Sequence, residues 1–311
     1  MERLTSGHAF PDDLRGGVIA LGNFDGFHRG HQAVVAHARA LAAADARPLI
    51  VATFDPHPVR FFHPDAPPFR LTTLDQRARL FAQAGADAML VFHFDADLAR
   101  ESAEDFVADR IAARTGASAV VTGEDFTFGR NKTGTVAVLA EIGPHYGIAA
   151  HAVAPVGDGS GAVSSSRIRE ALQAGDCETA TALLTRPFAI QGLVQHGDKL
   201  GRELGFPTAN LDMGKYLRPR YGIYAVRGHL PDGRTLGGAA NLGVRPSFDP
   251  PKELLEPHFF DFAGDLYGAT IEVELVSFLR PEAKYDGLDA LKAQIARDCA
   301  EARAILSSRS S

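Results

Sequence analysis

Short apolar runs alternate with helix-like segments through the first half of the chain. Apolar strands separated by helices indicate a parallel sheet that helices cover on both faces. Ligands of such sheets bind at the carboxyl ends of the strands. The pattern predicts strands over residues 18–21, 49–53, 88–92, 119–122 and 148–153, and helices over 32–44, 74–84 and 102–115. Ser102 is a suitable N-cap for the last helix, with Asp105 three residues on, and Gly116 a suitable end.

The pattern changes after Arg186-Pro187. A Gly/Ser-rich loop over 154–164 and a helical stretch over 167–184 precede the change. Closely spaced short β-runs follow and favour a small antiparallel barrel. These runs cover 192–195, 222–228, 235–242, 258–262 and 270–278. A helix over 288–306 ends the chain, and its apolar spacing predicts a face packed on the barrel, made of Leu288, Leu291, Ile295, Cys299, Ala302 and Leu306. We therefore expect two domains, 1–185 and 186–311.

Composition limits the class of protein. The 311 residues are 45% hydrophobic with a net charge of −6, so the chain can build cores but offers no basic face for nucleic acid. The two cysteines lack metal-ligand spacing and fit a reducing compartment. The N-terminus lacks the apolar segment of a signal peptide, and no run approaches a membrane span. We expect a cytoplasmic protein with small-molecule partners and neither nucleic-acid nor membrane partners; the sequence leaves open whether it forms a homo-oligomer.

The stretch GNFDGFHRGH, residues 22–31, follows the first predicted strand and precedes the first predicted helix. A helix N-terminus attracts phosphate through its unpaired N–H groups and its dipole. His28 and His31 can both face one phosphate site and stabilise charge on a transferring phosphoryl group. The alternative is that both histidines only cap the helix. The remaining candidates for phosphate contact in this stretch are Gly22, Phe24, Asp25, Gly26 and Gly30.

This stretch resembles the GxFDGxHxGH signature of the nucleotidyltransferase superfamily, whose members transfer a nucleotidyl group and release pyrophosphate. The run SSSRIR at 164–169 resembles the superfamily's SSTxIR, with Ser166 where threonine is usual. The resemblance implies a Rossmann-like first domain in which Ser164, Ser165 and Ser166 bind ATP phosphates. Arg169 is expected to clamp a phosphate. A phosphate acceptor is already ionised at neutral pH, so this step needs no strong base.

The run PTAN at 207–210 offers a second chemistry. Thr208 and Asn210 alternate to the same side of an extended chain, and their oxygens suit Mg²⁺. Gly201 and Gly205 suit a loop over a nucleotide. Taken alone, this run also fits an ordinary turn followed by a strand.

Glu256 lies in a mainly apolar and aromatic stretch, LEPHFFDF, where a carboxylate is suited to act as a general base. The alternative is an exposed glutamate at a strand edge. With GRELGFPTANL, this stretch resembles the riboflavin kinase family, which implies a small β-barrel. By the same resemblance, Thr208 and Asn210 serve Mg-ATP, and Glu256 deprotonates riboflavin. Pro257 departs from the small aliphatic residue that is frequent in the family. The run NLGVRPSF at 241–248 resembles the family's NxGxRPTF, with Ser247 for threonine, and gives Arg245 as a flavin or nucleotide contact.

Two further runs resemble motifs of proteins that combine these two activities. TFDPHP at 53–58 resembles their TFxPHP motif, and GEDFTFG at 123–129 resembles their GxDFxFG motif. They give His57, Asp125 and Phe128 as flavin or nucleotide contacts. Together the motifs resemble the family of bacterial bifunctional riboflavin kinases/FMN adenylyltransferases (FAD synthetases). The resemblance implies ATP as co-substrate, Mg²⁺ as cofactor, and conversion of riboflavin to FMN and then FAD.

Three alternatives stay open at this point. One half of the chain could be inactive, an alternative that only the serine replacements and Pro257 favour. The chain could also be a flavin-binding or regulatory module without catalysis. A cytidylyltransferase or a pantetheine-type adenylyltransferase would share the first half but would leave residues 187–311 unexplained.

Overall fold

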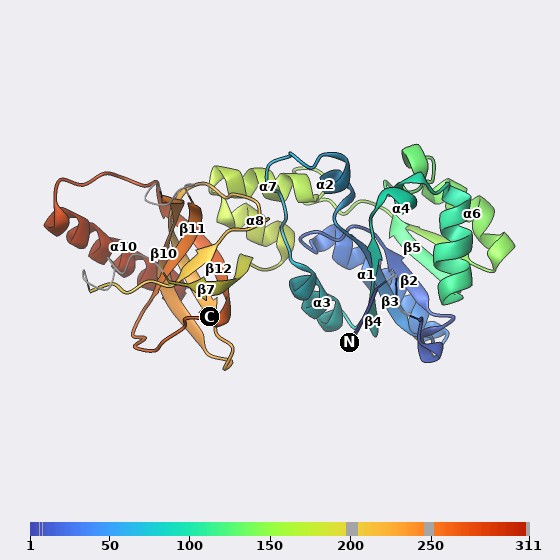
Figure 1. The fold of residues 1–311 in the computed structure, drawn as a ribbon, viewed down its shortest axis with the longest axis horizontal. Coiled ribbons are helices and arrows are strands. Elements are labelled where there is room, and N and C mark those ends of the chain that lie inside the picture. The colour runs from blue at the N-terminus through green and yellow to red at the C-terminus, as the bar shows by residue number, and fades with distance from the viewer. Residues whose placement is uncertain (6, 8, 197–204, 246–251, 309–311) are drawn as a thin grey trace. The chain divides into compact units, whose positions relative to one another are not determined.

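The computed structural model describes residues 1–311 except 6, 8, 197–204, 246–251 and 309–311 (Figure 1). The chain forms two compact units. The first contains Met1–Ala66 and Leu74–Ser164, and the second contains Pro67–Thr73 and Ser165–Ser311. The domain boundary expected near residue 185 stays a prediction.

The first unit contains a six-stranded sheet in the order β1-β4-β3-β2-β5-β6, and every neighbouring pair is parallel. Its strands are β1 Glu2–Thr5, β2 Val18–Leu21, β3 Leu49–Asp55, β4 Ala88–His93, β5 Ala119–Gly123 and β6 Ala149–Val153. After β2, the chain places β3 and β4 on one side of that strand and then β5 and β6 on its other side. The carboxyl ends of β2 and β5 therefore meet where the strand order reverses, which is the usual ligand position in such sheets.

Helices cover both faces of this sheet, as the apolar strands predict. Its helices are α1 Arg29–Ala44, α2 Pro58–Phe62, α3 Leu74–Gln83, α4 Ala96–Arg100, α5 Ala103–Asp105, the π-helix η2 Phe106–Ala113 and α6 Val136–Ile142, with short 3₁₀ turns at Asp12–Leu14, Arg130–Lys132 and Gly143–Tyr146. Side chains of α1 and α3 share one core with Val18 and Val51. Side chains of η2 and α6 share a second core with Ile19 and Ile50. The expected parallel sheet buried on both faces is confirmed.

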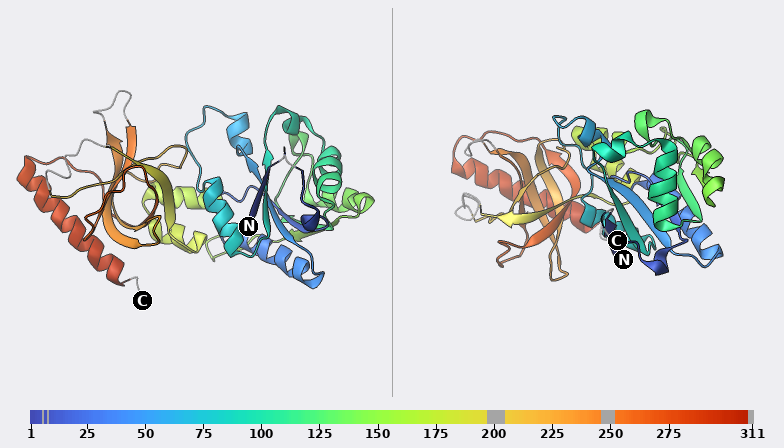
Figure 2. Two further views of the ribbon diagram at one scale, coloured as in Figure 1. Left: turned by 60° about the horizontal axis from the view of Figure 1, so that its bottom comes forward. Right: turned by 45° about the vertical axis from the view of Figure 1, so that its right-hand side comes forward.

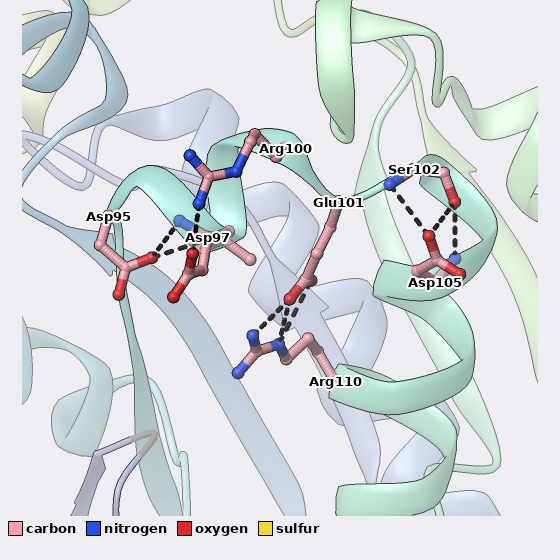
Figure 3. Close-up of polar contacts among 8 residues, drawn as sticks. Asp95, Asp97, Arg100, Glu101, Ser102, Asp105 and Arg110 are labelled. Carbon is pink, nitrogen blue, oxygen red and sulfur yellow. Dashed lines mark hydrogen bonds and ion pairs between the residues drawn. The ribbon is translucent and has the colours of Figure 1, made fainter.

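The helix expected from Ser102 begins with a capping box (Figure 3). Ser102 Oγ accepts a hydrogen bond from the Asp105 amide at 3.0 Å, and the Ser102 amide donates to Asp105 Oδ2 at 3.3 Å. The helix continues from α5 into η2. Arg110 of η2 forms an ion pair with Glu101, which precedes Ser102 in the chain. Gly116 follows its end in the left-handed region (φ 60°). The predicted start and stop signals are confirmed.

The second unit contains a closed antiparallel barrel with strand order β10-β11-β8-β7-β12-β9 (Figure 2). Its strands are β7 Phe188–Gln195, β8 Asn210–Asp212, β9 Gly222–His229, β10 Thr235–Arg245, β11 Lys252–Phe259 and β12 Thr270–Arg280. The expected barrel is confirmed. The prediction for β11 was wrong in position: the strand covers Lys252–Phe259 rather than 258–262. Its first half has adjacent charged residues followed by two adjacent buried leucines, so it lacks the regular alternation that predicts a strand.

The C-terminal helix α10, Leu288–Ser308, packs Ala302 and Leu306 against Ala225 and Val276 of the barrel. Cys299 is partly buried in the same cluster. Leu288 does not belong to this face, because it starts the helix and is 58% exposed.

The helical stretch expected over 167–184 is two helices, α7 Ser165–Ala174 and α8 Cys177–Leu184. The break lies at Gly175, which adopts a left-handed φ of 83°. A Cβ atom at this position would approach Arg220 and Phe278 at 3.1 and 3.2 Å. The tight turn and the close neighbours both favour glycine.

Candidate functional sites

The loop between β2 and α1 holds the first candidate site. It turns sharply, with positive φ at Phe24 (49°), Gly26 (87°) and Phe27 (44°). The rings of Phe24 and Phe27 are buried and pack edge-on against Phe81 of α3 at 5.8 and 5.1 Å between centroids. This packing holds the turn in one conformation. Asp25, also expected at the phosphate site, is buried within it.

His28 and His31 lie face to face at the start of α1. Their ring centroids are 3.6 Å apart with an angle of 19° between planes. His28 is the N-cap residue, and its Nδ1 accepts a hydrogen bond from the His31 amide at 3.4 Å. An acceptor Nδ1 places the proton of a neutral His28 on Nε2, which makes Nε2 the donor. The structure thus combines the two readings of the sequence: His28 caps the helix and still has a donor nitrogen.

Gly22 and Gly30 are close to these aromatic side chains. A Cβ atom at Gly30 would lie 3.2 Å from Cε1 of His28. A Cβ atom at Gly22 would lie 3.0 Å from the Phe24 ring. Both glycines therefore leave room for the rings that shape the turn.

The carboxyl end of β3 brings further candidates to the same edge of the sheet. His57 caps α2 by accepting a hydrogen bond from the Val59 amide at 3.2 Å. Sequence reasoning missed the aromatic cluster beside it. In this cluster the Phe61 and Phe62 rings lie 5.4 and 5.8 Å from the Phe94 ring, and Phe62 is 58% exposed. The adjacent phenylalanines that follow the TFDPHP run after Val59-Arg60 were the available signal.

Asp125 and Phe128 follow β5 but have different surroundings. Asp125 is exposed, and its Oδ1 lies 3.0 Å from where a Cβ atom of Gly123 would be. Phe128 is 7% exposed and packs against Phe106 and Phe126 at 5.6 and 6.1 Å. Phe128 therefore has a clear packing role, and the ligand contacts expected of both residues stay predictions.

The SSSRIR run divides between the two units. Ser164 ends the first unit, and Ser165 begins α7 of the second. Arg169 on α7 donates from Nε to the Phe69 carbonyl at 2.9 Å, and its guanidinium lies 5.3 Å from the centre of the Phe69 ring. Ser166 is exposed. The phosphate contacts expected of these residues stay predictions.

Glu256 is the centre of the candidate site on the barrel. It lies on β11 directly opposite Asn241 of β10, whose Nδ2 donates to Glu256 Oε2 at 3.4 Å. Arg245 forms an ion pair with the same carboxylate oxygen. The surroundings of Glu256 are therefore an amide and a guanidinium rather than the apolar stretch expected from the sequence, and its side chain is only 14% exposed. The sequence did not show this pairing because it depends on strand register.

Pro257 leaves the strand intact. It pairs with Ala240 of β10, and its carbonyl accepts a hydrogen bond from the Ala209 amide at 2.9 Å. The only bond lost is the one that its own nitrogen would donate on the Ala209 side. Glu256 therefore keeps its position on the barrel wall.

The expected metal ligands lie beside Pro257. Asn210 begins β8 and is buried, whereas Thr208 is half-buried, with Ala209 between them. A hydroxyl and an amide oxygen are hard, neutral donors that fit Mg²⁺ when nucleotide phosphates and water complete its shell. Among the residues that the structure describes, no three acidic, histidine or cysteine side chains gather into a metal site. Gly205, with φ of 89°, lies in the loop before Thr208, and Gly201 lies outside the described residues.

Comparison with known proteins assigns the two parts of the chain to two enzyme families. Residues 10–167 match the family described as FAD synthetase, and residues 184–306 match the family described as riboflavin kinase. The curated bifunctional riboflavin kinase/FMN adenylyltransferase of Escherichia coli K12 is 38% identical over 93% of this chain and 92% of its own length. The chain belongs to the bifunctional riboflavin kinase/FMN adenylyltransferase family. Other members of this family are similar over most of their length. The Pseudomonas fluorescens protein is 40% identical over 96% of both chains, and the Bacillus subtilis 168 protein is 36% identical over 95% of this chain and 94% of its own.

A solved structure has the same architecture as this chain. It is described as a macrolide-efflux protein from Streptococcus pneumoniae, and it aligns with a TM-score of 0.85 at 30% identity over 96% of this chain and 97% of its own. Every helix that the structure describes here is too short or too polar to cross a membrane.

Proposed function

We propose that the chain phosphorylates riboflavin to FMN on the barrel and then adenylylates FMN to FAD on the parallel-sheet unit. One observation supports this most strongly: a single chain contains both a stacked histidine pair at a helix N-terminus and a carboxylate paired across a closed barrel. The two transfers need different chemistry. An alcohol must lose a proton before it attacks phosphorus, whereas the FMN phosphate is already ionised.

In the adenylyl transfer, a phosphate oxygen of FMN forms a bond to the α-phosphorus of ATP. The bond between the α-phosphorus and the bridging oxygen breaks, and pyrophosphate leaves. His28 and His31 stand at the positive end of α1, where ring N–H groups stabilise charge on the phosphates. Ser164, Ser165, Ser166 and Arg169 are the further phosphate contacts of this proposal.

In the kinase step, Glu256 accepts the proton of the terminal riboflavin hydroxyl. The hydroxyl oxygen then forms a bond to the γ-phosphorus, the bond between the γ-phosphorus and the β–γ bridging oxygen breaks, and ADP leaves. The contacts of Glu256 with Arg245 and Asn241 hold its carboxylate in place for this transfer. Mg²⁺, held by Thr208 and Asn210, would neutralise the charge of the ATP phosphates.

Flavin binding to the first unit is proposed beside His57 and Asp125. The exposed Phe62 ring offers an apolar face on which a flat isoalloxazine ring can stack. We also propose a cytoplasmic location, which the two free cysteines Cys177 and Cys299 support. The proposed partners are small molecules only.

Separate supply of the two flavins tests the proposal. Riboflavin with Mg-ATP should give FMN and ADP first, and FMN with Mg-ATP should give FAD and pyrophosphate. FAD from supplied FMN without FMN from riboflavin would mean an inactive barrel. Tight flavin binding without ATP consumption would instead favour a non-catalytic module.

A further inference from the structure

A buried arginine on α3 connects two of the sequence motifs in the first unit. Arg77 is 3% exposed. Its Nη1 donates to Thr53 Oγ1 at 2.8 Å and to the Asn23 carbonyl at 3.1 Å. Its Nη2 lies 3.9 Å from Asp55 Oδ1. Asn23 belongs to the GNFDGFHRGH stretch, and Thr53 and Asp55 belong to TFDPHP.

Thr53 closes this group of contacts. It is fully buried, and its hydroxyl donates to the Asn23 carbonyl at 2.8 Å. The Asn23 carbonyl thus accepts bonds from a strand, β3, and from a helix, α3. Two such bonds fix the direction of the backbone immediately before Phe24, where the sharp turn toward His28 begins.

Packing alone does not explain an arginine at this position. The buried face of α3 also contains Phe81, and an apolar side chain would fill the same space without desolvating a charge. A guanidinium donates in several fixed directions in one plane, which lysine cannot reproduce. The geometry therefore favours a positioning function.

We infer that Arg77 is a positioning residue for adenylyl transfer: it holds the loop after β2 and the carboxyl end of β3 in the arrangement that presents His28, His31 and His57 to the nucleotide. This inference rests on the proposed function. By this inference, α3 contains none of the family motifs but fixes the positions of two of them, GNFDGFHRGH and TFDPHP.

Steady-state kinetics of FAD formation from FMN and Mg-ATP tests the inference with the full chain. The variants are Arg77→Met, Arg77→Lys and Thr53→Val, which keeps the side-chain shape but removes the hydroxyl. We expect Arg77→Met to lower kcat/KM by about 10- to 100-fold and to raise the KM for ATP, since small displacements of catalytic groups have effects of this size. Arg77→Lys should restore only part of the loss, and Thr53→Val should show a smaller change in the same direction.

Two controls separate positioning from loss of folding. A variant that merely unfolds in part has fewer active molecules, which lowers kcat but leaves the KM for ATP unchanged. Arg114→Met removes another guanidinium–carbonyl bond of the first unit, from Arg114 to Thr5 at 2.7 Å, and should leave both constants within about twofold. FMN formation from riboflavin by the same samples should be unchanged in every variant.

The inference is overturned if the parent makes FAD and the Arg77 variants keep its KM for ATP, or if Arg114→Met raises that KM equally. A parent that makes no FAD from FMN would overturn the proposed function and the inference with it, and the parent assay shows this separately.

Discussion

His31 lies over the ring of His28 rather than beside it, and only one of the two imidazoles caps the helix. Nδ1 of His28 accepts a hydrogen bond from the His31 amide, so the position of the His28 ring depends on the helix backbone. His31 packs edge-on against Phe24 at 5.2 Å. The two rings are thus held by different contacts, although the sequence presents them as equivalent.

We predict that His31→Ala lowers FAD formation from FMN by about 100- to 1,000-fold, the effect of removing one donor to a developing charge. FMN formation from riboflavin should persist, because Glu256 is on the other unit. Chromatography of both reactions measures this. Equal loss of both activities would contradict separate sites.

Glu256→Gln should give the reverse result. We predict a loss of FMN formation of about 100- to 10,000-fold, as expected for a general base, while supplied FMN is still converted to FAD. Glu253→Gln is the matched control on the same strand, because Glu253 pairs with Arg218 and not with Arg245. A kinase loss as large in the control would show that any β11 carboxylate gives the effect.

At the scale of the element, the first turn of α1 allows stability and activity to be separated. Alanine favours helices over glycine by about 1 kcal/mol, so Gly30→Ala should not destabilise the helix through its backbone. Its methyl group would press on the His28 ring at 3.2 Å. We predict slower FAD formation at an unchanged or higher Tm, measured by coupled assay and thermal unfolding. Parent-like FAD formation would mean that the position of His28 has no influence.

The β11 strand gives a prediction about pH. Burial alone would raise the pKa of Glu253, but hydrogen bonds from Tyr221 and Arg218 outweigh it and hold the pKa below its usual range. A lowered pKa in the folded state stabilises the protein above the ordinary glutamate pKa of about 4.3, and this stabilisation disappears as the pH falls through the lowered value. Denaturant unfolding should therefore show Glu253→Gln less stable than the parent at pH 7, with the difference shrinking below about pH 4. A constant difference across this range would exclude the ionised carboxylate as its cause.

At the scale of the whole molecule, the two folds follow from local patterns. Strand β2 was predicted with the bounds that the structure shows, and β3 to β6 to within two residues. Strands β2 to β5 are buried and mainly apolar, whereas the edge strand β6 is short and partly exposed. The edge strand β1 and the three-residue β8 were missed. Both are short, and β1 has two adjacent exposed charged residues before its single buried leucine.

Contacts between distant residues account for what the sequence could not show. The motifs predicted His28 and His31 at a helix start, and the structure places them there. They predicted Glu256 as a catalytic residue just before a barrel strand at 258–262, whereas the structure places it within β11. The partners of these residues depend on register and packing. Arg245 reaches Glu256 only through the pairing of β10 with β11, and Arg77 lies 54 residues from the Asn23 carbonyl that it contacts.

The most direct test of two sequential transfers uses one reaction with riboflavin and Mg-ATP labelled differently at the α- and γ-phosphates. The account predicts FMN that contains only the γ-label, followed by FAD that contains both labels, with one ADP and one pyrophosphate released per FAD. FAD that lacks the γ-label, or riboflavin that stays unchanged while ATP is present, would contradict it.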